Sequence, residues 1–244
     1  MNSPLIETFP DAAAWAEAAA ARLAAALGEG LRDPTQNGWA VFAGAGGSTP
    51  KPIYERLSNL RSYPDWQHTF VTLVDERYVP ETSPDSNAAL LKQSLMTNHA
   101  RGAVFLPLFS PAVTVDRAAA LATYELNVEL EERRLDAVLL GMGEDGHICS
   151  MFPESPTLKT LLTPDLKPAV YGVPPGRDGM APPQERLSIN LPYLANARRV
   201  LLALTGAKKR AVFEREAAGD PRVQPIAALI AAKVPLEVLW TEAV

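Results

Sequence analysis

The sequence predicts an α/β protein in which helices cover both faces of a doubly wound, mostly parallel sheet. Three observations predict this class. Short apolar runs alternate with helical segments, the runs are unbroken as in strands buried on both faces, and several end at glycine. Because no linker separates two cores, we expect a single domain over residues 1–244.

The expected helices carry start and stop signals. The first begins at Asp11, a common N-cap, is rich in alanine and ends near Gly28 or Gly30. In the second, Thr49 is expected to be the cap and Pro50 the first helical residue, where its missing N–H costs nothing. The third covers residues 86–96 and begins with a Ser/Asn cap. The remaining expected helices cover residues 115–134, 208–217 and 225–232.

The expected strands are short and rich in aliphatic side chains. They comprise residues 39–45, 69–75, 136–141, 169–173, 186–190, 199–204 and 236–240. Residues 172–186 contain several prolines and glycines and are expected to form a surface loop that borders a site.

Composition argues against several classes of partner. The chain has 23 basic and 28 acidic residues, a net charge of −5, and no basic block that could follow a nucleic-acid backbone. No apolar run reaches the ~18–20 residues of a membrane span, and the N-terminal residues lack a secretory pattern. Cys149 is the only cysteine, so no internal disulfide can form and a cytoplasmic location is expected. A monomer and a small homo-oligomer both remain open.

Unusual residues follow three of the expected strands. Ligands of open α/β sheets bind beyond the carboxyl ends of the strands, so these segments are expected to converge. The first segment, "FAGAGGSTP", offers the backbone N–H groups and hydroxyls of Gly46, Gly47, Ser48 and Thr49 to a small phosphate. It matches neither a Walker loop nor a dinucleotide fingerprint. The alternative is a tight turn that needs glycine for geometry alone.

The second segment is "VDERYVPETSPDSN", residues 74–87. Arg77 could hold a phosphate or a carboxylate through its planar guanidinium, and Asp75 could orient a hydroxyl or a histidine. The alternative is a solvated charged turn that precedes an ordinary helix cap at Ser86.

The third segment, "LLGMGEDGHICSMFP", places His147 on a glycine-rich corner. Glu144 and Asp145 precede it closely enough to set its tautomer or raise its basicity, which favours a catalytic histidine over one that caps a helix. Cys149 is interpreted as a packing residue, because a cysteine two residues away does not reach the imidazole across the local backbone. His68 and His99 show no metal-ligand spacing with His147, so we expect chemistry without a metal or other cofactor.

A fourth segment, "LALTGAKKRAVF", ends a strand and begins a helix with Lys208 and Lys209. A lysine there could reach an anion over the edge of the sheet, and a solvated basic helix start explains the spacing equally well.

Four ordered motifs, "GGSTP", "VDERYVP…PDSN", "GMGEDGHICSMFP" and "RLSINLPYLANARRVLLALTGAKKRAVF", resemble those of bacterial 6-phosphogluconolactonases. That family shares a superfamily with glucosamine-6-phosphate deaminases. The resemblance covers residue 38 to the C-terminus and implies hydrolysis of a sugar-phosphate lactone, with His147 as the general base. It also implies substrate-binding and positioning roles for Gly46, Gly47, Ser48, Thr49, Arg77, Lys209, Asp75, Glu76, Asn87 and Asp145, with Arg186 near the rim.

Two departures from the family pattern bear on the alternatives. Ile148-Cys149 replaces the usual Thr-Ala, and "DGHI" is the form found in the deaminases, whereas the "DER" that begins at Asp75 and the "RLSINLP" segment favour the lactonase. Ala181 stands where lactonases often have a lysine, and Arg177 is a possible substitute. A sugar-phosphate sensor with a DNA-binding module is the third hypothesis, for which the residues before the first expected strand leave little room.

Overall fold

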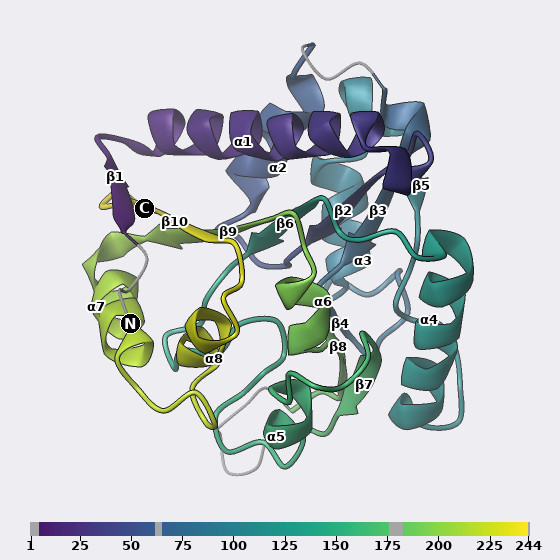
Figure 1. The fold of residues 1–244 in the computed structure, drawn as a ribbon, viewed down its shortest axis with the longest axis vertical. Helices are drawn as coiled ribbons and strands as arrows, with labels where there is room; N and C mark the ends of the chain where they lie inside the picture. The colour runs from purple at the N-terminus through teal and green to yellow at the C-terminus, as the bar shows by residue number, and fades with distance from the viewer. Residues whose placement is uncertain (1–4, 62–64, 176–182, 244) are drawn as a thin grey trace.

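The computed structural model describes residues 5–61, 65–175 and 183–243 (Figure 1). Within them, a seven-stranded parallel sheet has the strand order β1-β10-β9-β6-β2-β3-β5. Its strands are β1 (Ile6–Phe9), β2 (Ala40–Gly44), β3 (Thr69–Leu73), β5 (Val104–Phe105), β6 (Ala137–Leu140), β9 (Arg199–Thr205) and β10 (Leu236–Thr241). The predicted α/β class with a mostly parallel sheet is confirmed.

A second, three-stranded sheet has the order β4-β8-β7 and antiparallel pairing. It contains β4 (Asp75–Arg77), β7 (Val170–Val173) and β8 (Arg186–Ile189). Two of the predicted strands, residues 169–173 and 186–190, lie in this antiparallel sheet and not in the parallel one. Strand β8 pairs with the three charged residues of β4, which follow β3 in the chain, and β7 pairs with the other edge of β8.

Helices lie on both sides of the main sheet (Figure 1). Helix α1 packs across β2, β6, β9 and β10, while α7 packs against β9 and β10 and contacts α8. The helices are α1 (Ala12–Arg32), α2 (Lys51–Asn59), α3 (Asn87–Ser94), α4 (Val115–Leu130), α5 (Leu158–Leu161), α6 (Leu191–Ala195), α7 (Gly206–Ala217) and α8 (Pro225–Ala231). Single 3-10 turns occupy Pro34–Gln36, Trp66–His68 and Asn98–Gly102.

Helix termini follow the sequence signals in part. Asp11 caps α1 by accepting a hydrogen bond from the N–H of Ala14 at 2.7 Å, as predicted. The helix continues past the expected glycine stop to Arg32. Glycine is needed at position 30 for close packing, because the carboxylate of Asp136 fills the space a Cβ would need. Helix α2 begins at Lys51 without a side-chain cap, so the expected Thr49 cap is wrong.

Two other helix ends show local causes. Ser86 caps α3 by accepting from the N–H of Ala89, as predicted. Helix α4 ends four residues earlier than expected, because Glu131 adopts a positive φ of 52° that interrupts the helix.

One hydrophobic cluster runs through the main sheet and the helices packed on it. Strands β2, β3 and β6 are buried along their whole length, which explains their unbroken apolar sequences. Among the described residues, no helix is both long and apolar enough to cross a membrane.

The order in which the chain adds strands to the sheet reverses between β2 and β6. From β2 the chain adds β3 and then β5 on one side, whereas β6, β9 and β10 follow on the other. Such a reversal leaves a crevice beyond the carboxyl ends of the two central strands. The four adjacent strands β9, β6, β2 and β3 therefore deliver their following segments to one place.

Candidate active site

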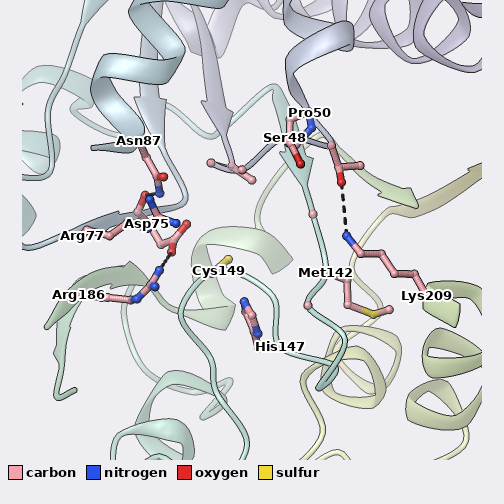
Figure 2. A pocket seen from close by; sticks show the side chains of 16 residues that line it. Ser48, Pro50, Asp75, Arg77, Asn87, Met142, His147, Cys149, Arg186 and Lys209 are labelled. Atoms are coloured by element: carbon pink, nitrogen blue, oxygen red, sulfur yellow. Dashed lines mark hydrogen bonds and ion pairs between the residues drawn. The ribbon is translucent and has the colours of Figure 1, made fainter. Parts of the chain in front are cut away.

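A cavity of about 230 Å³ lies beyond the carboxyl ends of these four strands (Figure 2). Residues from all four of the segments singled out in the sequence line it, together with one residue of β8. The lining comprises Ala45, Gly46, Gly47, Ser48, Thr49, Pro50, Asp75, Arg77, Asn87, Gly141, Met142, Gly143, His147, Cys149, Arg186 and Lys209. The expected convergence of distant turns is confirmed.

The glycine turn after β2 is held from both sides. The N–H of Ala45 donates to the carbonyl of Leu139 at 3.0 Å, and the buried Tyr54 hydroxyl donates to the carbonyl of Ala45 at 2.6 Å. Burial, and then the charge of Asp75, raises the pKa of Tyr54, so the phenol keeps the proton it donates. The turn is thereby fixed relative to β6, which carries the histidine segment.

This turn presents backbone donors to the cavity. Gly47 has a φ of +89°, a conformation that L side chains rarely adopt, and an added Cβ on Gly46 would collide with the Asn87 amide. Within the described residues, the N–H groups from Gly46 to Thr49 find no protein acceptor. They precede the N-terminus of α2, where the helix dipole also favours an anion.

His147 lies at the foot of the cavity, between its two sides (Figure 2). Its Nδ1 atom is 2.5 Å from Oδ1 of Asp145, and its backbone N–H donates to the same oxygen at 3.2 Å. Burial alone would raise the pKa of Asp145, but its hydrogen bonds with His147 outweigh burial and lower that pKa. The carboxylate therefore stays charged and favours the tautomer with the proton on Nδ1.

The other ring nitrogen of His147 is the one available for chemistry. No hydrogen bond to Nε2 occurs within the described residues. A tight turn supports this orientation: the N–H of Gly143 donates to the carbonyl of His147 at 2.9 Å, and Gly146 has a φ of +89°. A Cβ on Gly143 would overlap the imidazole, so glycine is needed there for close approach.

Asp75 and Arg186 form a buried ion pair across the cavity from Lys209 (Figure 2). The guanidinium Nη1 lies 3.6 Å from Oδ2 of Asp75, which also accepts a hydrogen bond from Ser150 Oγ at 2.6 Å. Burial lowers the pKa of Arg186, while the charge of Asp75 opposes that effect.

Polar atoms without partners surround this ion pair. Nε of Arg77, Nε of Arg186 and Oδ1 of Asn87 are buried and lack a hydrogen-bond partner among the described residues. Buried polar atoms are rarely left unpaired, because each costs about 1–3 kcal/mol. All three belong to residues that line the cavity, so a polar ligand there could supply the missing partners.

Glu76 points away from the cavity, as alternation along strand β4 requires. Its carboxylate accepts hydrogen bonds from the N–H groups of Arg77, Asn87 and Ala88 at 2.7–2.8 Å and from Ser86 Oγ at 3.0 Å. Burial raises the pKa of Glu76 against these bonds. This residue fastens the start of α3 to β4, and it therefore acts on the backbone of two cavity residues without lining the cavity itself.

Two lysines begin α7 and differ in their surroundings. Lys209 reaches the cavity, where Nζ lies 3.4 Å from Thr49 Oγ1, and burial lowers its pKa against the opposing charge of Glu144. Lys208 instead pairs with Glu144 at 2.5 Å on the exposed surface. Glu144, which the sequence suggested as a partner of His147, does not line the cavity, and Asp145 makes that contact.

Cys149 lines the cavity but is almost fully buried. Burial, and then the nearby charge of Asp75, raises the pKa of Cys149 well above its usual range. The residue therefore remains a thiol. Its backbone is left-handed, with a φ of +51°, and the buried Ser150 follows it. Within the part of the chain that the structure describes, no three His, Cys, Asp or Glu side chains are grouped so that they could hold a metal ion.

Comparison with known proteins assigns the family. The sequence model of the glucosamine-6-phosphate isomerases/6-phosphogluconolactonase family matches residues 10–240. The chain belongs to this family. It is 37% identical over 232 residues to a 6-phosphogluconolactonase of Mesorhizobium japonicum, covering 95% of this chain and 93% of the relative. It is 34% identical over 237 residues to one of Caulobacter vibrioides, covering 97% of each.

Solved structures of the family share the fold. The crystal structure of a 6-phosphogluconolactonase from Shewanella baltica has a TM-score of 0.86 at 30% identity, covering 98% of each chain. A monomeric glucosamine-6-phosphate deaminase has a TM-score of 0.74 at 19% identity, covering 97% of each chain. At 19% identity, the second likeness shows the fold alone.

In this family member, most residues singled out in the sequence lie together. The cavity brings together Gly46, Gly47, Ser48, Thr49, Asp75, Arg77, Asn87, His147, Arg186 and Lys209. Ser150 had not been singled out, although it follows His147 closely and its hydroxyl contacts Asp75. The departures at Arg177 and Ala181 fall outside the described residues.

Proposed function

We propose that this protein hydrolyses 6-phospho-D-glucono-1,5-lactone to 6-phospho-D-gluconate, a step of the oxidative pentose phosphate pathway. The observation that carries the proposal is the cavity in which an Asp-supported histidine faces backbone donors and three cationic side chains. Relatives at 34–37% identity over almost the whole chain are 6-phosphogluconolactonases, which supports the same substrate.

The first step is an attack by water on the lactone carbonyl carbon. Nε2 of His147 accepts a proton from the water as its oxygen bonds to C1, and Asp145 stabilises the resulting imidazolium through Nδ1. The carbonyl π electrons move to the carbonyl oxygen, which becomes an oxyanion. Free N–H groups of the glycine turn, from Gly46 to Thr49, stabilise that charge.

The second step opens the ring. The bond between C1 and the ring oxygen breaks, and the imidazolium of His147 returns its proton to that oxygen, which becomes the hydroxyl on C5. The product is a carboxylic acid, which loses a proton to solvent at neutral pH. No covalent enzyme intermediate is needed, which agrees with the burial and raised pKa of Cys149.

Positive charge on both sides of the cavity suits a substrate that gains a second anionic group. Arg77 and Arg186 lie on one side, and Lys209 lies on the other next to Thr49 (Figure 2). The lactone carries one phosphate, and the product carries a phosphate and a carboxylate. Asp75 and Asn87 can pair with the ring hydroxyl groups, and Oδ1 of Asn87 is an acceptor that no described residue contacts with a hydrogen bond.

The second candidate function is glucosamine-6-phosphate deamination. The "DGHI" sequence at His147 favours it, whereas Arg77 in the "DER" segment favours the lactonase. Both substrates are sugar phosphates of similar size, and the relatives at 34–37% identity favour the lactonase.

One experiment separates the two. Freshly generated 6-phosphogluconolactone is followed with and without protein, and a parallel assay measures ammonia release from glucosamine 6-phosphate. We expect accelerated lactone decay and no ammonia. Ammonia release without accelerated lactone decay would overturn the proposal in favour of the deaminase.

A further inference from the structure

A side-chain hydrogen bond joins the segment that carries His147 to the strand that carries Asp75 and Arg77. Ser150 is fully buried, and its Oγ donates to Oδ2 of Asp75 at 2.6 Å. Its backbone N–H donates to Ser188 Oγ on β8 at 3.2 Å. Ser150 itself does not line the cavity, so it reaches the site only through its neighbours.

Two donor groups face Oδ2 of Asp75 at different distances. Besides Ser150, it faces Nη1 of Arg186, but at 3.6 Å, which is too long for a hydrogen bond. Both partners of this ion pair are almost fully buried, so their attraction is weakly screened by water. The serine hydroxyl thus competes with Arg186 for the carboxylate.

The guanidinium of Arg186 also contacts the segment that carries His147. It lies over the ring of Phe152, with Cζ of Arg186 5.2 Å from the ring centre. The Phe152 ring also contacts the imidazole of His147, at 4.4 Å between ring centres. Two residues of the His147 segment therefore contact the ion pair: Ser150 binds the carboxylate, and Phe152 packs against the guanidinium.

We propose that Ser150 is a positioning residue that keeps the Asp75 carboxylate from closing onto Arg186, so that both groups stay available to the substrate. This inference rests on the proposed lactonase function. With Oδ2 held by Ser150, Oδ1 is left for a ring hydroxyl of the substrate. Nε of Arg186 is buried, has no hydrogen-bond partner in the part of the chain that the structure describes, and is likewise available.

Removing the hydroxyl should change how the ion pair is arranged. In Ser150→Ala, Oδ2 of Asp75 loses its closest donor and turns toward Arg186, since this is the remaining charged partner on that oxygen. A guanidinium and a carboxylate that close together form two parallel hydrogen bonds, so both carboxylate oxygens and Nε of Arg186 become engaged. The substrate then loses an acceptor and a cation in the ground state and in the transition state alike. Such a loss raises KM and leaves kcat nearly unchanged.

The kinetic test compares Ser150→Ala with the wild type and with a matched control. The substrate loses a hydrogen bond to a charged group of the Asp75–Arg186 pair. We therefore expect KM to rise about tenfold in Ser150→Ala and kcat to change by less than about threefold. A merely structural role would reduce the folded fraction, which lowers the apparent kcat without moving KM. Ser94→Ala is the control, because Ser94 is also buried but bonds only to the carbonyl of Leu90 on α3.

A double-mutant cycle tests whether Ser150 acts through Asp75. Asp75→Asn should raise KM, and adding Ser150→Ala to it should raise KM no further. Additive effects of the two substitutions on log KM would overturn the inference. If Ser150→Ala fails to fold, Ser150→Cys fills the space with a weak donor and should show the same increase in KM.

A structural readout separates this inference from the proposed function. In a crystal structure of Ser150→Ala, we expect Asp75 and Arg186 to lie within hydrogen-bond distance. An unmoved pair would overturn the inference whether or not the protein hydrolyses the lactone. A wild type that leaves the lactone untouched would overturn the proposed function, and a closed ion pair in the variant would still support the positioning role.

Discussion

The contact between Asp145 and His147 allows the sharpest prediction of a change in rate. In Asp145→Asn, the amide replaces a carboxylate that lies 2.5 Å from Nδ1 and stabilises the imidazolium formed during attack. Hydrogen bonds to charged groups contribute about 1.5–3 kcal/mol. At about 1.4 kcal/mol per factor of ten, kcat should fall roughly 10- to 150-fold. An amide that donates its NH2 to Nδ1 would also place the proton on Nε2 and add to the loss.

The assay follows the disappearance of 6-phosphogluconolactone under saturating conditions, corrected for spontaneous hydrolysis. Asp65→Asn is the matched control, because Asp65 makes the same kind of contact with Nδ1 of His68, at 2.8 Å, on the exposed surface. We expect the control to retain the wild-type kcat. A kcat for Asp145→Asn within twofold of the wild type would refute the idea that this carboxylate supports a catalytic imidazole.

Three further predictions concern binding, folding and pH. Arg77→Ala should raise KM by an amount equivalent to about 1.5–3 kcal/mol, because a charge-assisted contact with an anionic group is lost; an unchanged KM in the lactone assay would make Arg77 a structural residue. Gly47→Ala should lower the free energy of unfolding by about 1–2 kcal/mol, since the backbone has a φ of +89°. Gly141→Ala, which has open space and no positive φ, should change stability little in the same urea titration; equal losses in both variants would contradict the strain argument. Hydrogen bonds from the side chain and then the backbone of Arg222 lower the pKa of Asp220 to about 2. An unfolded aspartate titrates near ~3.9, so this stabilisation is present above about pH 4 and lost as the pH falls toward 2. Urea titrations over this range should show a smaller acid loss in Asp220→Asn, and an identical loss would contradict the assignment.

The sequence predicted the central strands because each is buried on both faces. Strands β2, β3 and β6 sit in the middle of the sheet, and their apolar runs end abruptly at glycine or charged residues. Strand β1 was missed, because its sequence "IETF" is short and lies at the sheet edge, where polar side chains are tolerated. The two-residue strand β5 was missed for the same reason.

The second sheet could not be predicted from local patterns. Strands β7 and β8 were recognised as extended, but β4, which pairs with β8, consists of three charged residues that read as a turn. What decides their pairing is the antiparallel register that places Asp75 opposite Ser188 and Arg77 opposite Arg186, a contact between residues far apart in the sequence.

Site residues were predictable where chemistry and backbone signals coincide. The glycine turn and His147 stand out because glycine, hydroxyl and titratable residues follow apolar strands. The assignment of Asp145 over Glu144 as the partner of His147 required the turn geometry at Gly146. Ser150 carried no signal in the sequence, because a serine in a loop is ordinary until its hydroxyl is found on a buried carboxylate.

The most direct test of the account compares His147→Ala with His68→Ala in the lactone assay. Both substitutions remove a histidine that contacts an aspartate, but only His147 lines the cavity. We predict that His147→Ala lowers kcat by ~10²-fold or more while the fold is retained, and that His68→Ala leaves it unchanged. A folded His147→Ala variant with wild-type turnover would contradict the central claim that this imidazole activates the attacking water.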